Sequence, residues 1–313
     1  MLSLCLGQRV EDGTLVTALQ QAARFYLLAG LRSVQLLDGV KTQQDWSDKL
    51  NDEQLASALS QLQALYGLHE LAGFDHEDVP ELKDAGEFVA YDLLLHADEP
   101  QDVAWMLLKL SPKLRKLPIV QRALRAFVAL QTDDFRAFFA EFGAMSLLEQ
   151  AAALRHLPKV WDRGLRMMNK GFGKQDRFPL EELARWMHLA DPESEGEGEL
   201  AERLCNAMKI QAQRHPPPPP PAPKENEEVA DSWEVVDDLT AKVSSLSVKK
   251  APSSIGFAQF KLAPLLERMD SGAVRSLLRD VVSRIEATLA AEGALLTTTE
   301  LIMGKTQETS TSG

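Results

Sequence analysis

One stretch decides the fold, and it opens with Glu87-Phe-Val-Ala-Tyr91. It continues through Asp133-Asp-Phe-Arg-Ala-Phe138-Phe139 and closes on Trp161-Asp-Arg-Gly-Leu-Arg-Met-Met-Asn-Lys-Gly-Phe172. Apolar residues recur there at steps of three and four residues, and Gly and Pro lie mainly between the apolar runs, which is typical of helices. Because a short helix is marginal alone in water, each must bury its apolar stripe on its neighbours. The sequence therefore predicts a mainly α fold, a packed stack of helices.

The helical pattern extends toward the N-terminus. Residues Thr14 to Gly30 predict a first helix, with Gly30 as its C-terminal stop. A further helix is predicted to begin at Asn51, where Asn51 or Asp52 serves as the N-cap. These helices and the stretch above make residues 1–176 the predicted helical-repeat part of the chain.

Local signals mark where the later helices begin. Pro100 and Pro118 each suit the first turn of a helix. Ser146, followed by Glu149, predicts a capping box at the start of another. Pro158 predicts a kink or a helix-turn-helix just before it.

These motifs together resemble the GANP (Sac-three) family. The resemblance rests on Leu62-x-x-Leu65-Tyr66, Glu87-Phe-x-Ala-Tyr91, Asp134-Phe-Arg-x-Phe-Phe139 and Arg163-Gly-Leu-Arg-Met-Met-Asn-Lys170, and it covers roughly residues 14–212. The family-motif residues that we expect to be structural are Leu62, Leu65, Tyr66, Glu87, Phe88, Ala90, Tyr91, Phe135, Phe138, Phe139 and Leu165.

The resemblance implies a fold and a function. The fold would be a right-handed, PCI-like stack of helical pairs that ends in a small winged helix. The function would be that of a non-catalytic nuclear scaffold, associated with the nuclear pore, which joins a second PCI-type subunit to form an RNA-binding platform for transcription-coupled mRNA export. The alternative is a protein-only scaffold, because some short family members act at the centrosome and mitotic spindle.

Residues 177–261 are predicted to form the winged-helix part. Helices at Phe178–Leu189 and Leu200–Ile210 suit its two helices, and Lys209 to Gln211 would begin the wing. The second wing strand is expected either at Leu246–Val248 or at Ile255–Phe260.

A proline-rich and acidic segment, 212–243, interrupts this part and is predicted to be disordered, because it has too little apolar surface to form a core. The prolines Pro216–Pro221 favour a polyproline helix that WW- or SH3-type domains bind.

The C-terminal region carries a continuous apolar stripe over residues 262–296, which predicts amphipathic helices. They are expected to pack back onto the domain, with partner binding as the alternative. Residues 297–313 are predicted to be a disordered tail.

Composition restricts the class of protein. The chain has 313 residues, 45% of them hydrophobic, and a net charge of -12, which argues against a surface that grips nucleic acid all over. Only Cys5 and Cys205 occur, so a reducing compartment is expected, and no run approaches the roughly 18 apolar residues of a membrane span. The expected location is therefore the cytosol or the nucleus.

Basic residues crowd one helix and the turn after it. Because they recur at three- and four-residue steps, several should share a face, either as a solvated surface or as phosphate ligands. Trp161 and Phe172 lie among them, where they would either stack on bases or pack in the core. The candidate nucleic-acid ligands are Lys159, Arg163, Arg166, Lys170, Lys174 and Arg177.

No motif predicts catalysis, a metal or a cofactor. The loop between Gly67 and Pro80 holds His69 and His76 among carboxylates, but without the spacing of zinc ligands. Gly171-Phe-Gly173-Lys174 lacks the spacing of a phosphate loop, and no strand is expected before it. We therefore expect neither an enzyme nor a metalloprotein.

Overall fold

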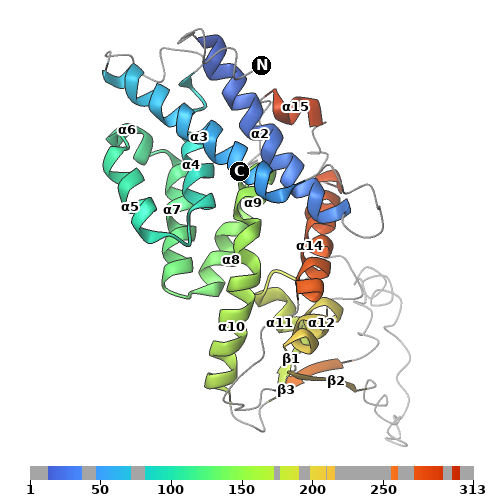
Figure 1. The fold of residues 1–313 in the computed structure, drawn as a ribbon. Helices are drawn as coiled ribbons and strands as arrows, with labels where there is room; N and C mark the ends of the chain where they lie inside the picture. Colours follow the sequence, from blue (N-terminus) through green and yellow to red (C-terminus); the bar gives the residue numbers. More distant parts are fainter. Residues whose placement is uncertain are drawn as a thin grey trace, which may run out of the picture.

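The computed structural model describes residues 13–36, 47–71, 82–172, 177–189, 198–208, 210–215, 255–259, 271–291 and 298–303. These residues are mainly helical, as predicted, and include one three-stranded sheet (Figure 1). The helices before the sheet are α2 (Gly13–Leu36), α3 (Asp48–Leu71), α4 (Ala85–Leu95), α5 (Pro100–Lys109), α6 (Pro112–Arg115), α7 (Pro118–Gln131), α8 (Phe135–Gly143), α9 (Leu147–Ala153), the 3-10 turn η2 (Leu154–His156) and α10 (Leu157–Gly171). The remaining elements are β1 (Arg177–Pro179), α11 (Leu180–Trp186), α12 (Glu199–Ala207), β2 (Gln211–His215), β3 (Ile255–Gln259), α14 (Ser271–Ala291) and α15 (Thr298–Ile302).

The helices are arranged from one end of the molecule to the other. Figure 1 shows α2 and α3 at one end and the sheet at the opposite end, with α10 running down to it. Helix α4 packs between α7, α9 and α3, and α7 in turn contacts α8. The last helices fold back onto the first, since α14 contacts α2 and α12, and α15 contacts α2.

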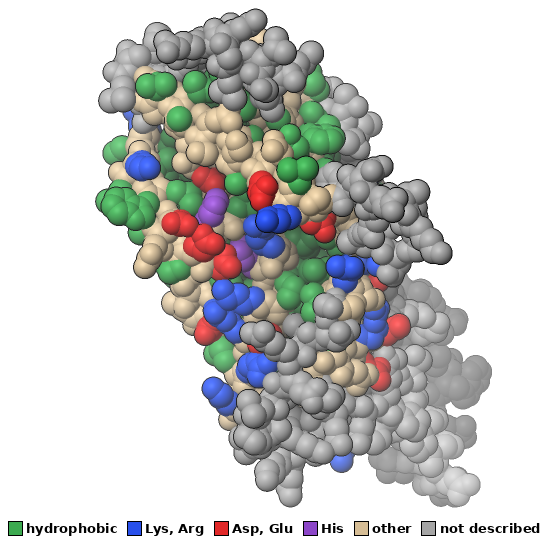
Figure 2. Space-filling model, in the orientation of Figure 1, with side chains coloured by type: hydrophobic (Ala, Val, Ile, Leu, Met, Phe, Trp, Pro, Cys, Tyr) green, Lys and Arg blue, Asp and Glu red, His purple; other side chains and the backbone are tan. Residues whose placement is uncertain are grey.

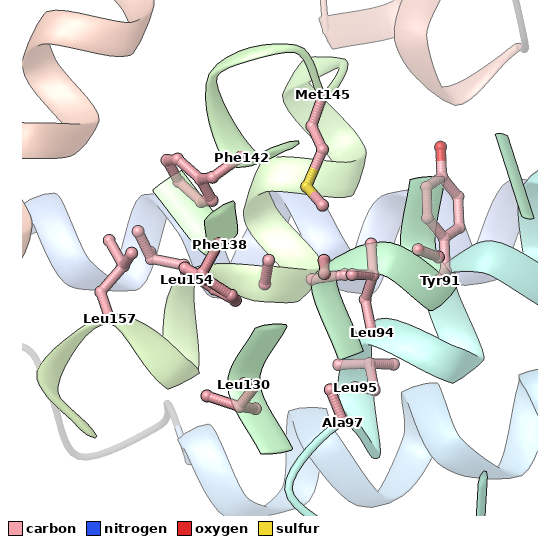
Figure 3. Packing of buried hydrophobic residues seen from close by; sticks show 14 of the residues in the cluster. Tyr91, Leu94, Leu95, Ala97, Leu130, Phe138, Phe142, Met145, Leu154 and Leu157 are labelled. Atoms are coloured by element: carbon pink, nitrogen blue, oxygen red, sulfur yellow. The ribbon is translucent and has the colours of Figure 1, made fainter. Parts of the chain in front are cut away.

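The core lies where several helices meet. Figure 3 shows Tyr91 and Leu94 of α4, Leu130 of α7 and Phe138 of α8 converging with Leu157 of α10. All of these side chains are buried. Within α8 the rings of Phe138 and Phe142 lie 6.3 Å apart, a distance at which aromatic pairs attract.

A buried ion pair joins α2 to α4. The Arg24 side chain is 3% exposed and makes two parallel hydrogen bonds to Glu87, with Nε to Oε1 at 2.9 Å and Nη2 to Oε2 at 2.7 Å. Arg24 Nη2 also donates to Asp84 at 2.8 Å, and its guanidinium lies 4.9 Å from the centre of the Phe88 ring. The Tyr91 hydroxyl donates to Glu87 Oε1 at 2.6 Å. The polar and aromatic residues of Glu87-Phe-x-Ala-Tyr91 therefore serve one contact with α2.

Charge and burial are balanced in this network. Burial opposes the charge on Arg24, yet its hydrogen bonds to Glu87 and Asp84 outweigh that effect, and the pKa of the guanidinium is raised. Burial, together with the Glu87 carboxylate, raises the pKa of Tyr91 well above its ordinary value. This shift favours the protonated hydroxyl, which donates its hydrogen bond to Glu87.

The first two helices differ from the sequence prediction. Helix α2 continues through Gly30 to Leu36, because Leu31 is buried in the core and the packing outweighs the cost of one glycine. Helix α3 starts one turn before Asn51, and the Ser47 hydroxyl accepts from the Leu50 backbone N–H. Asn51 instead lies inside the helix and donates to the Tyr26 carbonyl at 3.0 Å.

The later helix boundaries confirm their predictions. Pro100 and Pro118 begin α5 and α7. Ser146 and Glu149 form a capping box, with the Ser146 N–H donating to Glu149 at 2.9 Å. The 3-10 turn η2 marks the break before Pro158, which lies in the first turn of α10.

The sheet has the order β1-β3-β2, with both pairs antiparallel. Phe178 of β1 and Ala212 of β2 both lie opposite Ala258 of β3. Of the two positions expected for the second wing strand, Ile255–Phe260 contains β3, whereas Leu246–Val248 lies outside the described residues.

Three segments correct the sequence prediction. Strand β1 was not expected, since Pro179 weakens the strand signal, but proline is tolerated at a sheet edge. Residues 212–215 of the segment predicted to be disordered form most of β2, because β3 supplies the backbone hydrogen bonds. Residues 298–302 of the predicted tail form α15, whose Leu301 and Ile302 pack against the core. The segment 216–243 and the sequence 304–313 lie outside the described residues.

Helix α14 packs back onto the domain. Leu277, Val281 and Val282 of α14 are buried. Arg203 of α12 bonds Asp280 of α14 at 2.6 Å, so polar contacts support the same packing. Residues 262–270 of the predicted helical region lie outside the described residues.

The buried Phe88 ring provides a first test of the core. The side chain is 1% exposed, so Phe88→Ala should leave a cavity and lower the free energy of unfolding by about 3 to 5 kcal/mol. Chemical denaturation would measure this. The matched control is Val128→Ala on exposed α7 surface, which should change little; equal effects of the two substitutions would contradict the assigned core.

A double-mutant cycle tests the pair Arg24 and Glu87. Arg24→Met leaves a largely buried carboxylate without its partner and should cost about 3 to 5 kcal/mol of unfolding free energy. Because the two side chains interact directly, Arg24→Met/Glu87→Met should cost clearly less than the sum of the single changes. The control is the pair of exposed Arg125 and half-buried Glu141, where Arg125→Met should have a smaller effect. Additive costs at Arg24 and Glu87 would contradict the coupling.

Candidate nucleic-acid interface

The family-motif residues lie in the core or in its polar network. Phe135 is partly buried, and Glu87 belongs to the ion pair described above. The fully buried members are Leu62, Leu65, Tyr66, Phe88, Ala90, Tyr91, Phe138, Phe139 and Leu165. The motifs therefore describe how the helices pack, and the candidate interface has to come from other residues.

The basic face of α10 is occupied by ion pairs. Arg163 donates to Asp133 in the turn between α7 and α8 at 2.6 Å, and Lys159 lies 3.8 Å from Asp98 after α4. Arg166 bonds Asp162 of its own helix at 2.7 Å. Three of the six candidate phosphate ligands thus already face carboxylates.

A further ion pair lies nearer to α3. Arg155, in the η2 turn, bonds Asp52 of α3 at 2.8 Å. Figure 2 shows acidic and basic side chains mixed across the middle of this face, and mainly basic ones lower down. Each exposed pair contributes roughly 0 to 1 kcal/mol, so phosphate can compete for these cations but must displace a carboxylate to do so.

Two of the candidate ligands are better placed for phosphate. Lys170, in the last turn of α10, and Arg177, in β1, are exposed, and within the described ranges neither has a carboxylate in ion-pair distance. Lys174 lies outside the described residues. Among the described candidate ligands, the two without a facing carboxylate therefore lie at the sheet end of α10.

The two aromatic residues proposed to stack on bases have other roles. Trp161 is 0% exposed and donates from Nε1 to the Met187 carbonyl at 3.1 Å, so base stacking by Trp161 is wrong. The Trp161 ring thus lies between α10 and the end of α11. Phe172 is partly buried, and its ring lies 5.2 Å from the Phe178 ring.

An aromatic cluster at the sheet end was missed by the sequence analysis. Trp186 of α11 lies 4.9 Å from Phe178 and holds the Arg136 guanidinium 4.6 Å above its ring. Arg136 is exposed and belongs to the Asp134-Phe-Arg motif, which was the signal that could have identified it. Arg136, Lys170 and Arg177 around this cluster form what we call the sheet-end cations.

Close packing brings the elements of this cluster together. At Gly164 of α10, an added Cβ would lie 3.1 Å from both the Phe135 ring and the Met187 side chain. A larger residue would therefore force these two side chains to shift by a few tenths of an ångström.

Titratable groups elsewhere have structural explanations. Burial lowers the pKa of His156, whose Nε2 lies 2.7 Å from the Leu94 carbonyl oxygen. The hydrogen bond between His96 and Asp92 raises the pKa of His96 to about 9. Burial raises the pKa of the Cys205 thiol to about 12, so this thiol behaves as a small apolar group.

The predicted acidic loop from Gly67 to Pro80 lies largely outside the described residues. Among the residues that are described, no three His, Cys, Asp or Glu side chains come together in a way that could hold a metal ion. In the same part of the chain, no helix combines the length and apolar character that a membrane span needs.

Comparison with known proteins agrees with the motifs. A search of curated proteins gives no match. A family model described as the SAC3/GANP family matches residues 5–214, a range that runs from before α2 into β2 and includes the four motifs on which the resemblance rests. Since this range is more than half of the chain, the protein belongs to the SAC3/GANP family.

Proposed function

We propose that the protein is a non-catalytic nuclear scaffold of transcription-coupled mRNA export, which joins a second PCI-type subunit to build an RNA-binding platform. The observation that carries this proposal is the family match over residues 5–214, which spans the helical part and the elements at the sheet end. The motif residues contribute to packing and leave exposed surfaces for partners, as a scaffold requires.

The sheet end supports the winged-helix part of the proposal. A strand, two helices and two further strands follow one another as β1, α11, α12, β2 and β3, and the strands form one antiparallel sheet. Helix α11 contacts α12, β1 and β3, while α12 contacts β2. This order, with the last strand in the middle, is that of a winged helix. The helices α2 to α10 would then be the PCI-like stack that carries it.

A second subunit would bind at this end. The strands β1 and β2 are the edges of the three-stranded sheet, and edge strands leave backbone N–H and C=O groups available for a partner. One of the sheet-end cations, Arg177, lies in the edge strand β1. A partner with a basic winged helix would therefore enlarge the small positive surface that the sheet-end cations form.

The charge distribution determines how strongly the isolated chain binds RNA. The net charge of -12 creates a repulsive long-range field, against which the sheet-end cations must act. Binding by the isolated chain should therefore be weak, and the partner subunit should strengthen it by adding cations.

Two pairs of charge reversals test the RNA-binding surface. Lys170→Glu/Arg177→Glu should weaken binding to fluorescent single-stranded RNA and reduce the log-log salt slope by about 0.7 for each lost phosphate contact. The matched pair Arg163→Glu/Arg166→Glu reverses cations that already face carboxylates and should reduce the slope less. Fluorescence anisotropy at several salt concentrations, with and without the partner, would measure both.

The outcomes separate the proposal from its rivals. Salt-independent binding, or equal slopes for both folded variants, would contradict an RNA surface at the sheet end. Affinity purification followed by mass spectrometry should recover a PCI-type subunit from nuclear extract, and its absence would contradict the proposed complex.

The second candidate is a protein-only scaffold at the centrosome and mitotic spindle. The ion pairs along α10 favour it, because they neutralise half of the cations that the sequence offered to phosphate. Spindle proteins in the purified material, together with no RNA binding by the assembled complex, would establish this candidate instead.

A further inference from the structure

Helix α5 is poorly covered by the rest of the protein. Only Val103 of its ten residues is buried. Trp105 is 64% exposed and Leu108 is 75% exposed, so two large apolar side chains face solvent on one short helix. With 3.6 residues per turn, both lie on the side of the helix opposite Val103.

Charges are separated along this helix. Glu99 and Asp102 lie at its N-terminal end, and Lys109 is its last residue, with Lys116 soon after. All four side chains are exposed. The hydrogen bond with Asp102 raises the pKa of Glu99, and the negative charge of Asp102 adds to this shift. Lys109 has no ion-pair partner among the described residues.

The mixed charge limits what can cover the apolar side chains. A nucleic acid would meet the cations at one end of α5 but would be repelled by Glu99 and Asp102 at the other. The partner must instead carry positive charge opposite Asp102, negative charge opposite Lys109 and apolar groups between them.

A second copy of α5 in antiparallel orientation meets this description. Asp102 lies three residues before Trp105 and Lys109 lies four residues after it, so a two-fold axis near Trp105 brings each Asp102 opposite the other copy's Lys109. Trp105 and Leu108 of both copies then meet at the centre. Antiparallel helices also place the positive end of each helix dipole beside the negative end of the other.

We propose that the protein forms a homodimer through α5, with Asp102 of each copy paired to Lys109 of the other around a core of Trp105 and Leu108. Figure 2 shows hydrophobic side chains protruding over α5, and Figure 1 places α5 and α6 at an edge of the molecule away from the sheet. The dimer goes beyond the proposed function and leaves the sheet end free for another subunit.

The contact is small. A helix of ten residues is about 15 Å long, and interfaces much below roughly 1,000 Å² are typical of transient complexes. The dimer should therefore depend on concentration and form in the micromolar range or above. It is also expected to weaken with salt, since two of its contacts are exposed ion pairs.

Charge exchange tests this geometry directly. Sedimentation velocity of the full chain should show a concentration-dependent dimer for the unmodified protein. Asp102→Lys alone and Lys109→Glu alone should each remain monomeric, because like charges then meet twice. An equimolar mixture of the two variants should dimerise again, since each of the two contacts would then join one cation to one carboxylate.

Trp105→Ser/Leu108→Ser should also remove the dimer. The matched controls lie on α3, where Leu50→Ser removes an exposed apolar side chain and Glu53→Lys reverses an exposed charge; neither should change the association. Thermal unfolding checks that every variant is folded.

Four results would overturn the proposal. The first is a monomer at all concentrations, and the second is a dimer that survives the α5 substitutions. The third is a mixture of the two charge variants that stays monomeric. A loss of RNA affinity in Trp105→Ser/Leu108→Ser without any change in association would assign the face to nucleic acid and likewise overturn the dimer.

Discussion

The ion pair between Arg24 and Glu87 is the contact on which the helical part depends. A guanidinium that is 3% exposed is tolerated only when its hydrogen bonds are satisfied, so the pair favours the arrangement of α2 and α4 that satisfies them. Tyr91 and Phe88 complete that contact from the same turn of α4. Apolar packing alone would allow neighbouring registers, since one leucine can replace another in a helical stripe.

The parts of the fold that the sequence predicted depend on neighbours in the chain. A capping box at Ser146 involves residues three apart, and the stripe through Phe88 and Tyr91 repeats within one helix, so both are visible in the sequence. The end of α2 was misjudged because Gly30 breaks helices only where no packing opposes it. The sheet was predicted only in part, because β1 has three residues that include Pro179, and most of β2 lies in a polar segment whose strand is held by pairing with β3.

The candidate site depends even more on contacts between residues that are distant in the sequence. The spacing of Lys159, Arg163 and Arg166 correctly indicated one helix face, since all three lie on α10. It could not indicate that Asp98 and Asp133 reach that face, because these carboxylates come from turns some 30 to 60 residues earlier in the chain, and only the tertiary fold brings them there. Arg136 was overlooked for a related reason, since Trp186, on which it lies, is also distant in sequence.

The order of the strands has a consequence for how the chain acquires its structure. Strand β3 lies between β1 and β2, so these two strands do not pair with each other, and the strand that pairs with both follows the family-matched range 5–214. During synthesis the N-terminal helices can pack as soon as they emerge, whereas the sheet must wait until residue 259 has left the ribosome. Helix α2 waits longer still for its cover from α14. The family-matched range therefore lacks the central strand of the sheet, and the sheet end of the molecule is completed late in translation.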